Sequence, residues 1–405
     1  MLVRKHLWVG VAMPRTRELR VDPARRIIWL KCTVVVAFCL GLALSAHLWI
    51  GPRTYPATPI LGLLPTLDGI VAQALFAALF VLAGAIIVSS QPHPFIVAFL
   101  AIMALFCLLD QTRWQPWVYQ YGFLLATLAL FSWKRDDVDG RSRALNIARL
   151  VVASTYVWSG LQKLNLNFVD NEFPWIVEPI TRLVPGLSEP LHLFAMAVPF
   201  VQAAFGIGLL TRRFRRVSLV MAVAMHVFIL AMFGPAGHNW NEVIWPWTAA
   251  MAVFDILLFA DTDDVSARAI VWSDGSPAHV AAVVLFVAMP LLSFFNLWDS
   301  YLSSALYSGN ITEAQIYTSD AGKAGLPAAI ARHLVHTSAD TNVINIQRWA
   351  FEDLGVSPYP EARVFRSIAR SVCGQMADRA QLVLIVKEER LFFSRPEMGY
   401  RCRDL

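Results

Sequence analysis

Apolar segments long enough to cross a bilayer recur along the chain up to about residue 295. One helical span needs about 20 mostly apolar residues, and its backbone polar groups must be satisfied within the helix. Such segments lie at residues 27–49, 68–90, 94–109, 115–133, 145–164, 190–211, 217–233, 241–260 and 277–295. The sequence therefore predicts an all-α polytopic membrane helix bundle of about nine spans. With 57% hydrophobic and 16% charged residues, the composition excludes a set of ordinary water-soluble domains.

The basic residues lie in short clusters between the apolar segments, where the positive-inside rule places them on the cytoplasmic side. The clusters that follow the fourth and sixth segments consist of Lys134, Arg135, Arg141, Arg143, Arg212, Arg213, Arg215 and Arg216. The loop 234–240 carries neither Lys nor Arg. This alternation predicts a cytoplasmic amino terminus and an outer carboxy-terminal part, in a bacterial-type inner membrane. A net charge of +5 that is distributed in this way does not indicate nucleic-acid binding.

Three regions follow from this pattern. Residues 1–25 contain several arginines and no apolar core, which predicts a basic cytoplasmic arm instead of a signal peptide. Residues 26–297 form the helical membrane domain. From residue 298 to 405, Gly, Pro and charged residues return at ordinary frequency, which predicts a small soluble α+β domain on the outer, periplasmic side. Within it we expect strands at 315–317 and 382–386 and helices at 326–336, 344–354 and 360–373.

Two residue types in the outer domain bear on covalent and metal chemistry. Cys373 and Cys402 are its two cysteines, and in an oxidising compartment they are candidates for a disulfide, although their spacing does not decide it. His333 and His336 would share a helix face, but a two-histidine pair lacks the further ligands of a metal site. We therefore predict no metal.

The segment 151–165 closes on Lys163, which needs a reason because a cation at the end of a membrane helix is costly. At helical spacing, Tyr156, Ser159, Gly160 and Lys163 share one small, polar and aromatic face. One interpretation is an interfacial lysine that anchors the helix, with Gln162 beside it. The functional alternative is a partly buried amine that takes a proton from a substrate.

Three more polar clusters lie near span ends or at membrane depth. In the turn 110–119, we expect Asp110 and Arg113 to form an ion pair, or to form one wall of a site with Tyr119 nearby. His226 lies inside the seventh segment, where a structural hydrogen bond and a catalytic role are both open. His238, Asn239 and Asn241 follow in the next loop, as substrate-binding candidates or ordinary loop polarity.

These residues resemble a known family. The run Tyr156-Val157-Trp158-Ser159-Gly160-Leu161-Gln162-Lys163-Leu164-Asn165, with Asn167-Phe168-Val169 after it, is similar to a segment of the vitamin K-dependent γ-glutamyl carboxylases and their bacterial relatives, the HTTM family. There, a Gly-x-x-Lys-Leu run holds the lysine thought to act as base toward the hydroquinone. The turn Asp110-x-Thr112-x-Trp114 and His226 also resemble family positions. The resemblance covers about residues 30 to 260.

The chain departs from the family at one position. Where the carboxylases place a catalytic histidine after Trp-Asn-Asn, this chain reads Trp114-Gln115-Pro116-Trp117. The resemblance therefore implies a carboxylase-like member that lacks one catalytic histidine.

Two functions from different classes follow. In the first, a quinol or another lipophilic substrate enters from the bilayer, with Lys163 and His226 as catalytic residues and Tyr119, Tyr156, Gln162, His238, Asn239 and Asn241 as substrate-binding residues. The outer domain would then present or recognise a periplasmic protein or peptide.

In the second, the protein is not an enzyme on its own, but a subunit like the quinone-linked DoxX proteins, whose spans carry similar Ser-Gly-x-x-Lys-Leu runs, or a scaffold that displays the outer domain. Convergence of Lys163, His226 and Tyr119 on one lipid-accessible cavity would favour the enzyme.

Overall fold

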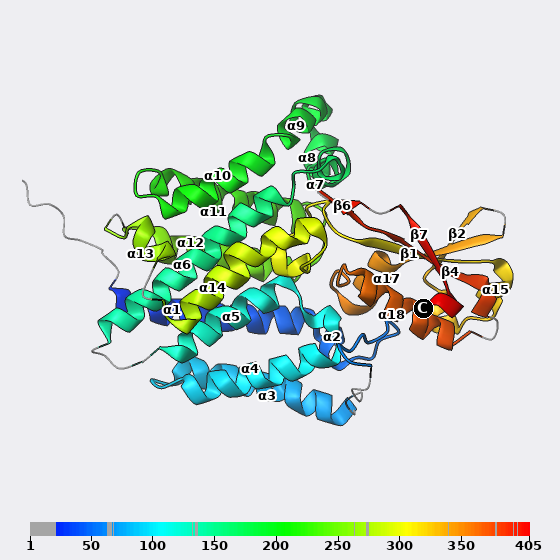
Figure 1. The fold of residues 1–405 in the computed structure, drawn as a ribbon, viewed down its shortest axis with the longest axis horizontal. Coiled ribbons are helices and arrows are strands. Elements are labelled where there is room, and N and C mark those ends of the chain that lie inside the picture. Colours follow the sequence, from blue (N-terminus) through cyan, green and yellow to red (C-terminus); the bar gives the residue numbers. More distant parts are fainter. Residues whose placement is uncertain are drawn as a thin grey trace, which may run out of the picture.

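The computed structural model is mostly helical, with a small antiparallel sheet near the carboxy terminus (Figure 1). It describes residues 22–405 except 63–66, 68, 132, 134–136, 263, 273, 274, 339, 377, 378, 392 and 395. The expected basic arm lies outside the described residues up to position 21, and α1 already begins at Pro23, so residues 23–25 belong to the first helix.

The helical part consists of long helices joined by short helical turns. In chain order these are α1 Pro23–Leu44, α2 Ala46–Ile50, α3 Gly69–Val88, α4 His93–Leu109, η1 Gln111–Arg113, α5 Pro116–Leu130, α6 Val138–Leu161, η2 Phe168–Glu172, α7 Phe173–Ile176, α8 Glu178–Leu183, η3 Pro185–Leu187, α9 Ser188–Ala195, α10 Val198–Leu210, α11 Arg215–Phe233, α12 Ile244–Phe259, α13 Ala267–Val271 and α14 Pro277–Ala282. After α14 the chain continues in helical form through η4 Val283–Ala288 and η5 Met289–Phe295. The helix starts follow local chemistry: the Asp22 carboxylate caps α1, and Asp137 caps α6 by accepting from the Gly140 amide at 2.8 Å.

Four helical segments are long and apolar enough to cross a membrane: α1, α3, α11 and the helical segment Pro277–Phe295. A fifth span results if the pair Pro185–Ala195 and Val198–Leu210, which is bent by 60°, counts as one. The helices α4 and α12 are apolar but shorter. The predicted count of about nine spans is therefore not established. For α6 the reason is visible in its sequence, because its first half carries Asp139, Arg141, Arg143, Asn146 and Arg149.

Helices α6 and α10 pack unusually closely at two glycines. A Cβ atom on Gly160 would lie 2.6 Å from the Pro199 carbonyl oxygen and 2.7 Å from the Ala203 amide nitrogen. One on Gly206 would lie 2.9 Å from the amide nitrogen of Val157. Small residues permit this backbone contact in membrane helix pairs. The contact fixes the face of α6 that carries Tyr156 and Ser159 against α10.

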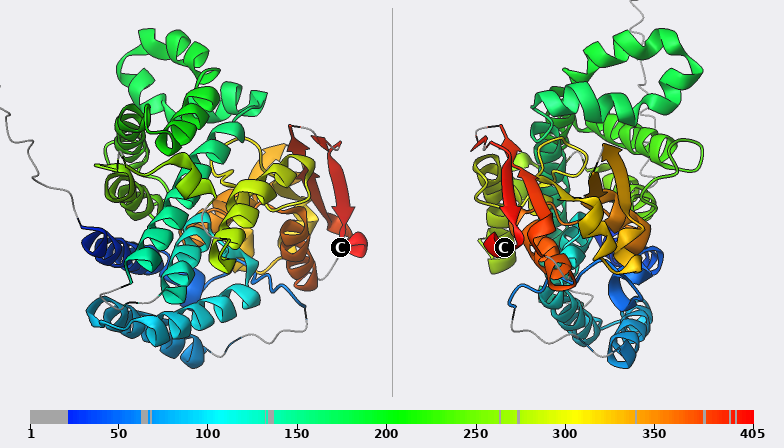
Figure 2. Two further views of the ribbon diagram at one scale, coloured as in Figure 1. Left: turned by 60° about the vertical axis from the view of Figure 1, so that its left-hand side comes forward. Right: turned by 90° about the vertical axis from the view of Figure 1, so that its right-hand side faces the viewer.

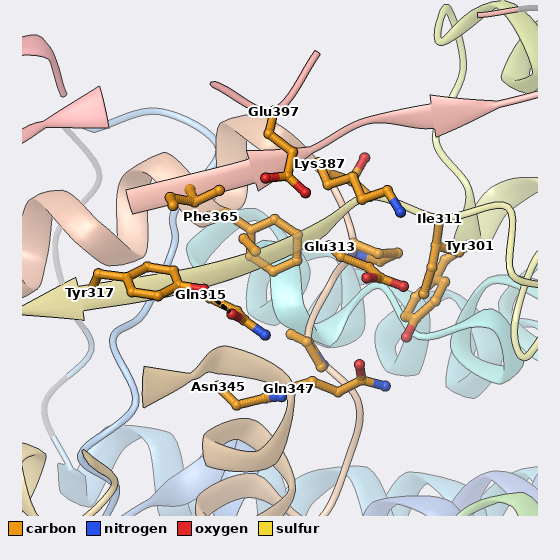
Figure 3. A pocket seen from close by; sticks show the side chains of 15 residues that line it. Tyr301, Ile311, Glu313, Gln315, Tyr317, Asn345, Gln347, Phe365, Lys387 and Glu397 are labelled. Atoms are coloured by element: carbon orange, nitrogen blue, oxygen red, sulfur yellow. Dashed lines mark hydrogen bonds between the residues drawn. The ribbon is translucent and has the colours of Figure 1, made fainter. Parts of the chain in front are cut away.

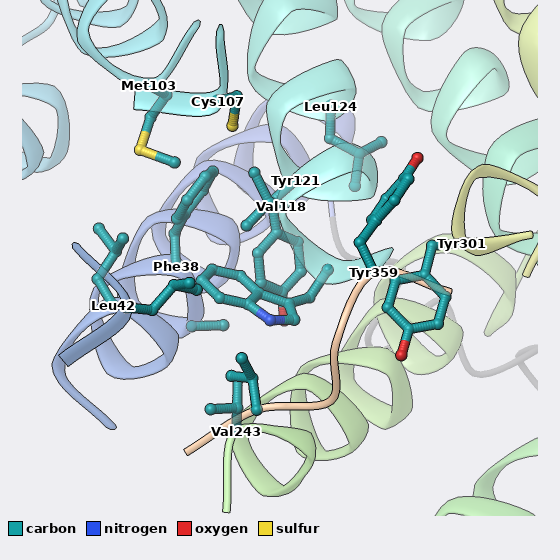
Figure 4. Close-up of a cluster of buried hydrophobic side chains, with 14 of the residues drawn as sticks. Phe38, Leu42, Met103, Cys107, Val118, Tyr121, Leu124, Val243, Tyr301 and Tyr359 are labelled. Carbon is teal, nitrogen blue, oxygen red and sulfur yellow. The ribbon is translucent and has the colours of Figure 1, made fainter. Parts of the chain in front are cut away.

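A large aromatic core holds α1, α4 and α5 together. Phe38 packs edge-on against Phe99 and Trp117, with ring centroids 5.1 and 5.5 Å apart, and Tyr121 lies beside them. Figure 4 shows this cluster with Tyr301 and Tyr359, which come from the carboxy-terminal part of the chain. The helical part and the carboxy-terminal domain thus share one continuous core.

The carboxy-terminal domain is built on a five-stranded sheet with the order β2-β3-β1-β4-β7, in which every pairing is antiparallel. The strands are β1 Glu313–Thr318, β2 Leu334–Ser338, β3 Thr341–Asn345, β4 Leu382–Lys387 and β7 Met398–Arg401, and the short strands β5 Glu389–Arg390 and β6 Phe393–Ser394 form a separate pair. Helices α17 Ile346–Leu354 and α18 Ala362–Gly374 pack against the sheet, while η6 Tyr301–Ser303, α15 Asp320–Ala324, α16 Ala328–Ala331, η7 Arg379–Gln381 and η8 Cys402–Asp404 lie in the connections. Figure 2 shows the domain from two further directions.

One predicted element of this domain is wrong. The expected helix 326–336 is helical only at Ala328–Ala331, and its second half is strand β2. His333 and His336 therefore do not share a helix face. His333 bonds to Glu352 through Nδ1 at 2.8 Å, and His336 pairs with Asn342 across the sheet. Strand β2 is recruited by hydrogen bonding to β3, which local sequence does not reveal.

Cys373 and Cys402 form a disulfide in this structure. The bond ties the end of α18 to η8, next to the last strand of the sheet.

The two parts of the molecule meet at polar contacts as well as in the core. The Asp353 carboxylate accepts from the amides of Thr54 and Tyr55, and Gln115 donates to the Ser357 carbonyl at 3.0 Å. These bonds satisfy backbone donors of an irregular segment that would otherwise be buried without partners. The carboxy-terminal domain is thus docked on the helical part.

The predicted Asp110–Arg113 ion pair is replaced by a different one. Asp110 pairs with Arg53, with Nη2 and Oδ2 2.7 Å apart. Arg113 instead donates to the carbonyls of Leu48, Trp49 and Phe106, at the ends of α2 and α4. Its fork of donors satisfies helix-end carbonyls that lack intrahelical partners.

The close contact of α6 with α10 gives a first prediction. Gly160→Ala should lower stability by about 1–3 kcal/mol, because the new methyl group meets backbone atoms that must move. Gly122→Ala is the matched control: it lies in helix α5, the nearest atom to its Cβ would be 3.9 Å away, and alanine favours helix by up to about 1 kcal/mol. Thermal unfolding of both variants in detergent tests this. An equal shift for both would show that the glycine contact is not tight.

Candidate functional site

A cavity of about 390 Å³ lies between α6, α10, α11 and α12, and is closed at one end by the segments 168–177 and 304–307. Its wall is mainly apolar, with six phenylalanines: Phe168, Phe173, Phe194, Phe205, Phe228 and Phe233. Few polar side chains reach it, and among the described residues these include Lys163, His226 and Tyr156. An apolar cavity of this size with a few convergent polar groups is typical of a small-molecule site.

The cavity reaches the outer surface of the helical part. Phe194, Val201, Met221 and Ala224 line it and are also exposed, and they come from α9, α10 and α11. These helices belong to segments that are long and apolar enough to cross a membrane. In a bilayer, an apolar molecule would therefore reach the cavity from the side.

Lys163 turns back along its own helix. Its Nζ donates to the Ser159 carbonyl at 2.7 Å and to the Ser159 hydroxyl at 3.0 Å. Gln202 of α10 donates to the same hydroxyl at 3.0 Å. Within the described part of the chain no carboxylate pairs directly with this amine, which is 9% exposed and lies 5.8 Å from the centre of the Phe168 ring. The amine therefore presents its remaining hydrogen-bonding capacity to the cavity.

Tyr156, His226 and Asp255 form a buried hydrogen-bonded chain. The Tyr156 hydroxyl lies 2.6 Å from His226 Nε2 and 2.7 Å from Asp255 Oδ2. The exposed fraction of each residue is 5% or less. Helices α6, α11 and α12 each contribute one member, so the chain exists only because these helices pack together.

The end of α6 beyond the cavity is held by the carboxy-terminal segment. Gln162 donates to the Ser293 hydroxyl at 2.7 Å and to the Ser303 carbonyl at 3.2 Å, and its amide oxygen accepts from Asn310. Asn165 donates to the Ser308 carbonyl at 2.8 Å. The segment 293–310 thus fixes the turn that carries Lys163.

Glu172 is the carboxylate whose charge acts on Lys163. It lies in the turn after α6, outside the apolar spans. Burial raises the pKa of Glu172 to about 7, the charge of Glu313 raises this pKa further, and Lys163 opposes the shift. This carboxyl group therefore changes charge near neutral pH beside the cavity.

The structure brings some of the predicted site residues together and separates others. Lys163, His226 and Tyr156 line one cavity. Asn241 lies behind its wall and donates to the Tyr307 hydroxyl at 3.0 Å. Four predicted residues lie outside the cavity lining: Tyr119, Gln162, His238 and Asn239.

These four have other contacts. Tyr119 stacks on Phe286 with centroids 4.8 Å apart, so it does not converge with Lys163 and His226. His238 stacks on Trp175 and bonds to its carbonyl at 2.7 Å. Asn239 has a positive φ of 49°, and its amide closes the turn on Gly234. Gln162 bonds to Ser293, Ser303 and Asn310 of the segment 293–310, as described above.

Sequence reasoning missed Asp255 and Gln202. Asp255 is a carboxylate inside the apolar segment 241–260, and the cost of a charge at membrane depth that singled out His226 applies to it equally. Gln202 is likewise a polar side chain inside an apolar segment, 190–211, but the free-energy cost of its burial is smaller because it is uncharged.

A second, smaller cavity of about 160 Å³ lies in the carboxy-terminal domain (Figure 3). Alternate side chains of β1, Glu313, Gln315 and Tyr317, border it together with Lys387 and Glu397. This cavity is polar, in contrast to the first. Within the described part of the chain, no group of three or more His, Cys, Asp or Glu residues could hold a metal ion.

No protein-family model, curated protein or solved structure matches this chain. The resemblance to the carboxylase-like family therefore rests on the motif residues alone.

The raised pKa of Glu172 gives a second prediction. The folded protein holds this proton more tightly than the unfolded chain between about pH 4.5 and 7, so stability should fall as pH rises through that window. The loss should reach up to about 3 kcal/mol at pH 8. Glu172→Gln should remove it, so that the variant melts above wild type at pH 8 and with it at pH 4.

Melting temperatures in detergent from pH 4 to 8 measure this difference. The exposed Glu178, paired with Arg182, supplies the control Glu178→Gln, which should follow the wild-type profile. Parallel wild-type and Glu172→Gln profiles at every pH would contradict the assignment.

Proposed function

We propose that this chain is a membrane-embedded, vitamin K-dependent carboxylase-like (HTTM) protein that binds a quinol or a similar hydroxylated lipophilic ring between α6, α10, α11 and α12. The observation that carries the proposal is the position of the Lys163 amine and the His226 imidazole in one apolar cavity. The cavity size, the aromatic wall and the opening toward the apolar surface suit a lipid-soluble ring.

Lys163 is the base in this proposal. A neutral amine that takes the proton of a bound hydroxyl becomes an ammonium next to the new oxyanion, so the two charges form together and stabilise each other. The Ser159 carbonyl and hydroxyl, 2.7 and 3.0 Å from Nζ, orient the amine toward the cavity. In a site that excludes water, such an oriented charge acts more strongly than in solution.

The proposal places the protein in an inner membrane with its amino terminus in the cytoplasm and the carboxy-terminal domain on the periplasmic side. The segment 293–310, which clamps Gln162 and Asn165, connects that domain to the Lys163 end of the cavity. A periplasmic protein or peptide bound by the domain would therefore lie near the site.

Carboxylation of glutamate is not part of the proposal. Trp117 stands where the family has a catalytic histidine, and it is buried in the aromatic core against Phe38 instead of in the cavity.

The test is binding of a defined probe to purified full-length protein. Decylubiquinol should bind wild type, and Lys163→Met should weaken binding by about 10- to 100-fold, since a hydrogen bond to a charged group contributes about 1.5–3 kcal/mol. Mass spectrometry of lipids that co-purify with each protein should show a quinone with wild type and less of it with the variant.

Lys31→Met is the matched control. Lys31 is also a buried lysine of the helical part, but it donates to the carbonyls of Ile87 and Ser89, outside the cavity. If Lys163→Met binds decylubiquinol as wild type does, the lysine is not at a quinol site. If wild type carries only bulk phospholipid and binds no probe, the non-enzymatic alternative is favoured, in which the membrane part displays the outer domain to a partner.

A further inference from the structure

We propose that the chain Asp255–Tyr156–His226 is a second proton exit from the cavity, in which Asp255 finally receives a proton that a bound hydroxyl gives to His226 Nδ1. The inference rests on the proposed function, because it requires a hydroxylated ligand in the cavity. It names two further positioning and proton-carrying residues, Tyr156 and Asp255.

The hydrogen positions follow from what each group can donate. A phenol carries one hydrogen, and a carboxylate only accepts. With Asp255 ionised, the Tyr156 hydroxyl donates to Asp255 Oδ2, and His226 Nε2 then carries a hydrogen and donates to the Tyr156 oxygen. A neutral imidazole with hydrogen on Nε2 has a bare lone pair on Nδ1.

That nitrogen belongs to a residue of the cavity wall and is itself buried without a partner. His226 is 5% exposed and lines the cavity, and its Nδ1 has no hydrogen-bond partner among the described residues. A buried polar atom without a partner costs about 1–3 kcal/mol, so a hydroxyl that donates to it is favoured. His226 and Lys163 both belong to the lining of this cavity.

The proton movement balances without any change of electrons. The ligand O–H bond breaks as an Nδ1–H bond forms. The Nε2–H bond breaks as a new Tyr156 O–H bond forms, and the original Tyr156 O–H bond breaks as an Asp255 Oδ2–H bond forms. The imidazole and the phenol end neutral, and the negative charge has moved from Asp255 to the ligand oxygen. The total charge of the apolar site is unchanged, which avoids the large cost of creating a buried charge.

Both proton exits reach the same section of the cavity. Lys163 folds back to Ser159, which lies three residues from Tyr156 on α6, about 4.5 Å along the helix axis. The amine and the imidazole both line this one cavity, so a single ligand can reach both.

Histidine NMR tests the hydrogen-bonded chain Asp255–Tyr156–His226 without any ligand. In full-length protein labelled with ¹⁵N-histidine, with the His226 signal assigned by its loss in His226→Gln, wild type should show a protonated Nε2 and a bare Nδ1. Tyr156→Phe should release this fixed tautomer. A protonated Nδ1 in wild type would overturn the assignment.

A chromogenic phenol tests proton transfer. In the Lys163→Met background, where the amine cannot take the proton, the fraction of bound 2,6-dimethyl-4-nitrophenol that absorbs as phenolate should fall about tenfold when Tyr156→Phe or Asp255→Asn is added, because neither variant can deliver the proton to residue 255. Asp255→Asn keeps the size and the accepting oxygen, so it serves if Tyr156→Phe folds poorly. Tyr119→Phe, which removes a tyrosine hydroxyl outside the cavity, should leave the fraction unchanged in the same background.

The two proposals fail in different ways. If wild type binds no phenol and no decylubiquinol, the proposed function fails, while the tautomer measured by NMR still reports on the hydrogen-bonded chain. If wild type binds the phenol and Lys163→Met weakens binding, but the two chain variants keep the full phenolate fraction, the proton exit through Asp255 is wrong and the quinol site stands.

Discussion

The arrangement of the site depends on the close contact between α6 and α10. Gly160 and Gly206 remove the side chains that would hold the two backbones apart. This approach brings Gln202 to the Ser159 hydroxyl, and it leaves the adjoining face of α6, with Tyr156 and Lys163, directed at α11 and α12. Helix packing in lipid has little hydrophobic driving force, so such backbone contacts are a main source of specificity.

The carboxy-terminal domain completes the site although it contributes little of the cavity wall. Buried Arg390 donates to the Asn310 carbonyl and, at 2.9 Å, to the Ser300 hydroxyl, while Glu361 accepts from Ser300. These bonds hold the segment that clamps Gln162. The carboxy-terminal domain is thereby tied, through this segment, to the turn that carries Lys163.

Much of the fold follows from local sequence, and the site follows only in part. Apolar length located the helices, and the cost of intramembrane charge singled out Lys163 and His226. The same reasoning could have found Asp255. It could not show that Tyr156 joins residues 70 and 99 positions away, because that contact is created by three helices packing together. Strand β2 was missed for a similar reason, since it depends on its partner β3.

Polarity and a position near a span end did not by themselves identify the residues that line the cavity. Tyr119, His238 and Gln162 all lie near span ends, as a ligand-binding group would. In the structure they stack on Phe286 or Trp175, or close a clamp. A single sequence shows which residues are polar but not which way their side chains point. These residues could therefore not be distinguished by sequence from the polar residues that line the cavity.

The buried cations of the helical part show what distinguishes Lys163. Arg113, Arg149 and Arg215 donate to carbonyl oxygens near helix ends, at Leu48, Leu258 and Leu209 among others. Their charge is thereby spread over backbone groups that need a donor, which is a structural use of a guanidinium.

Lys163 instead bonds within its own helix turn, to a residue that also lines the cavity, and its amine lies 5.8 Å from the centre of the Phe168 ring. The three arginines donate to backbone carbonyls of the fold, whereas the Lys163 amine lies at the edge of the cavity. An interfacial anchor would direct its charged end to water, whereas the Lys163 side chain lines the cavity. The direction of the side chain, more than its presence at a span end, is therefore the argument for a chemical role.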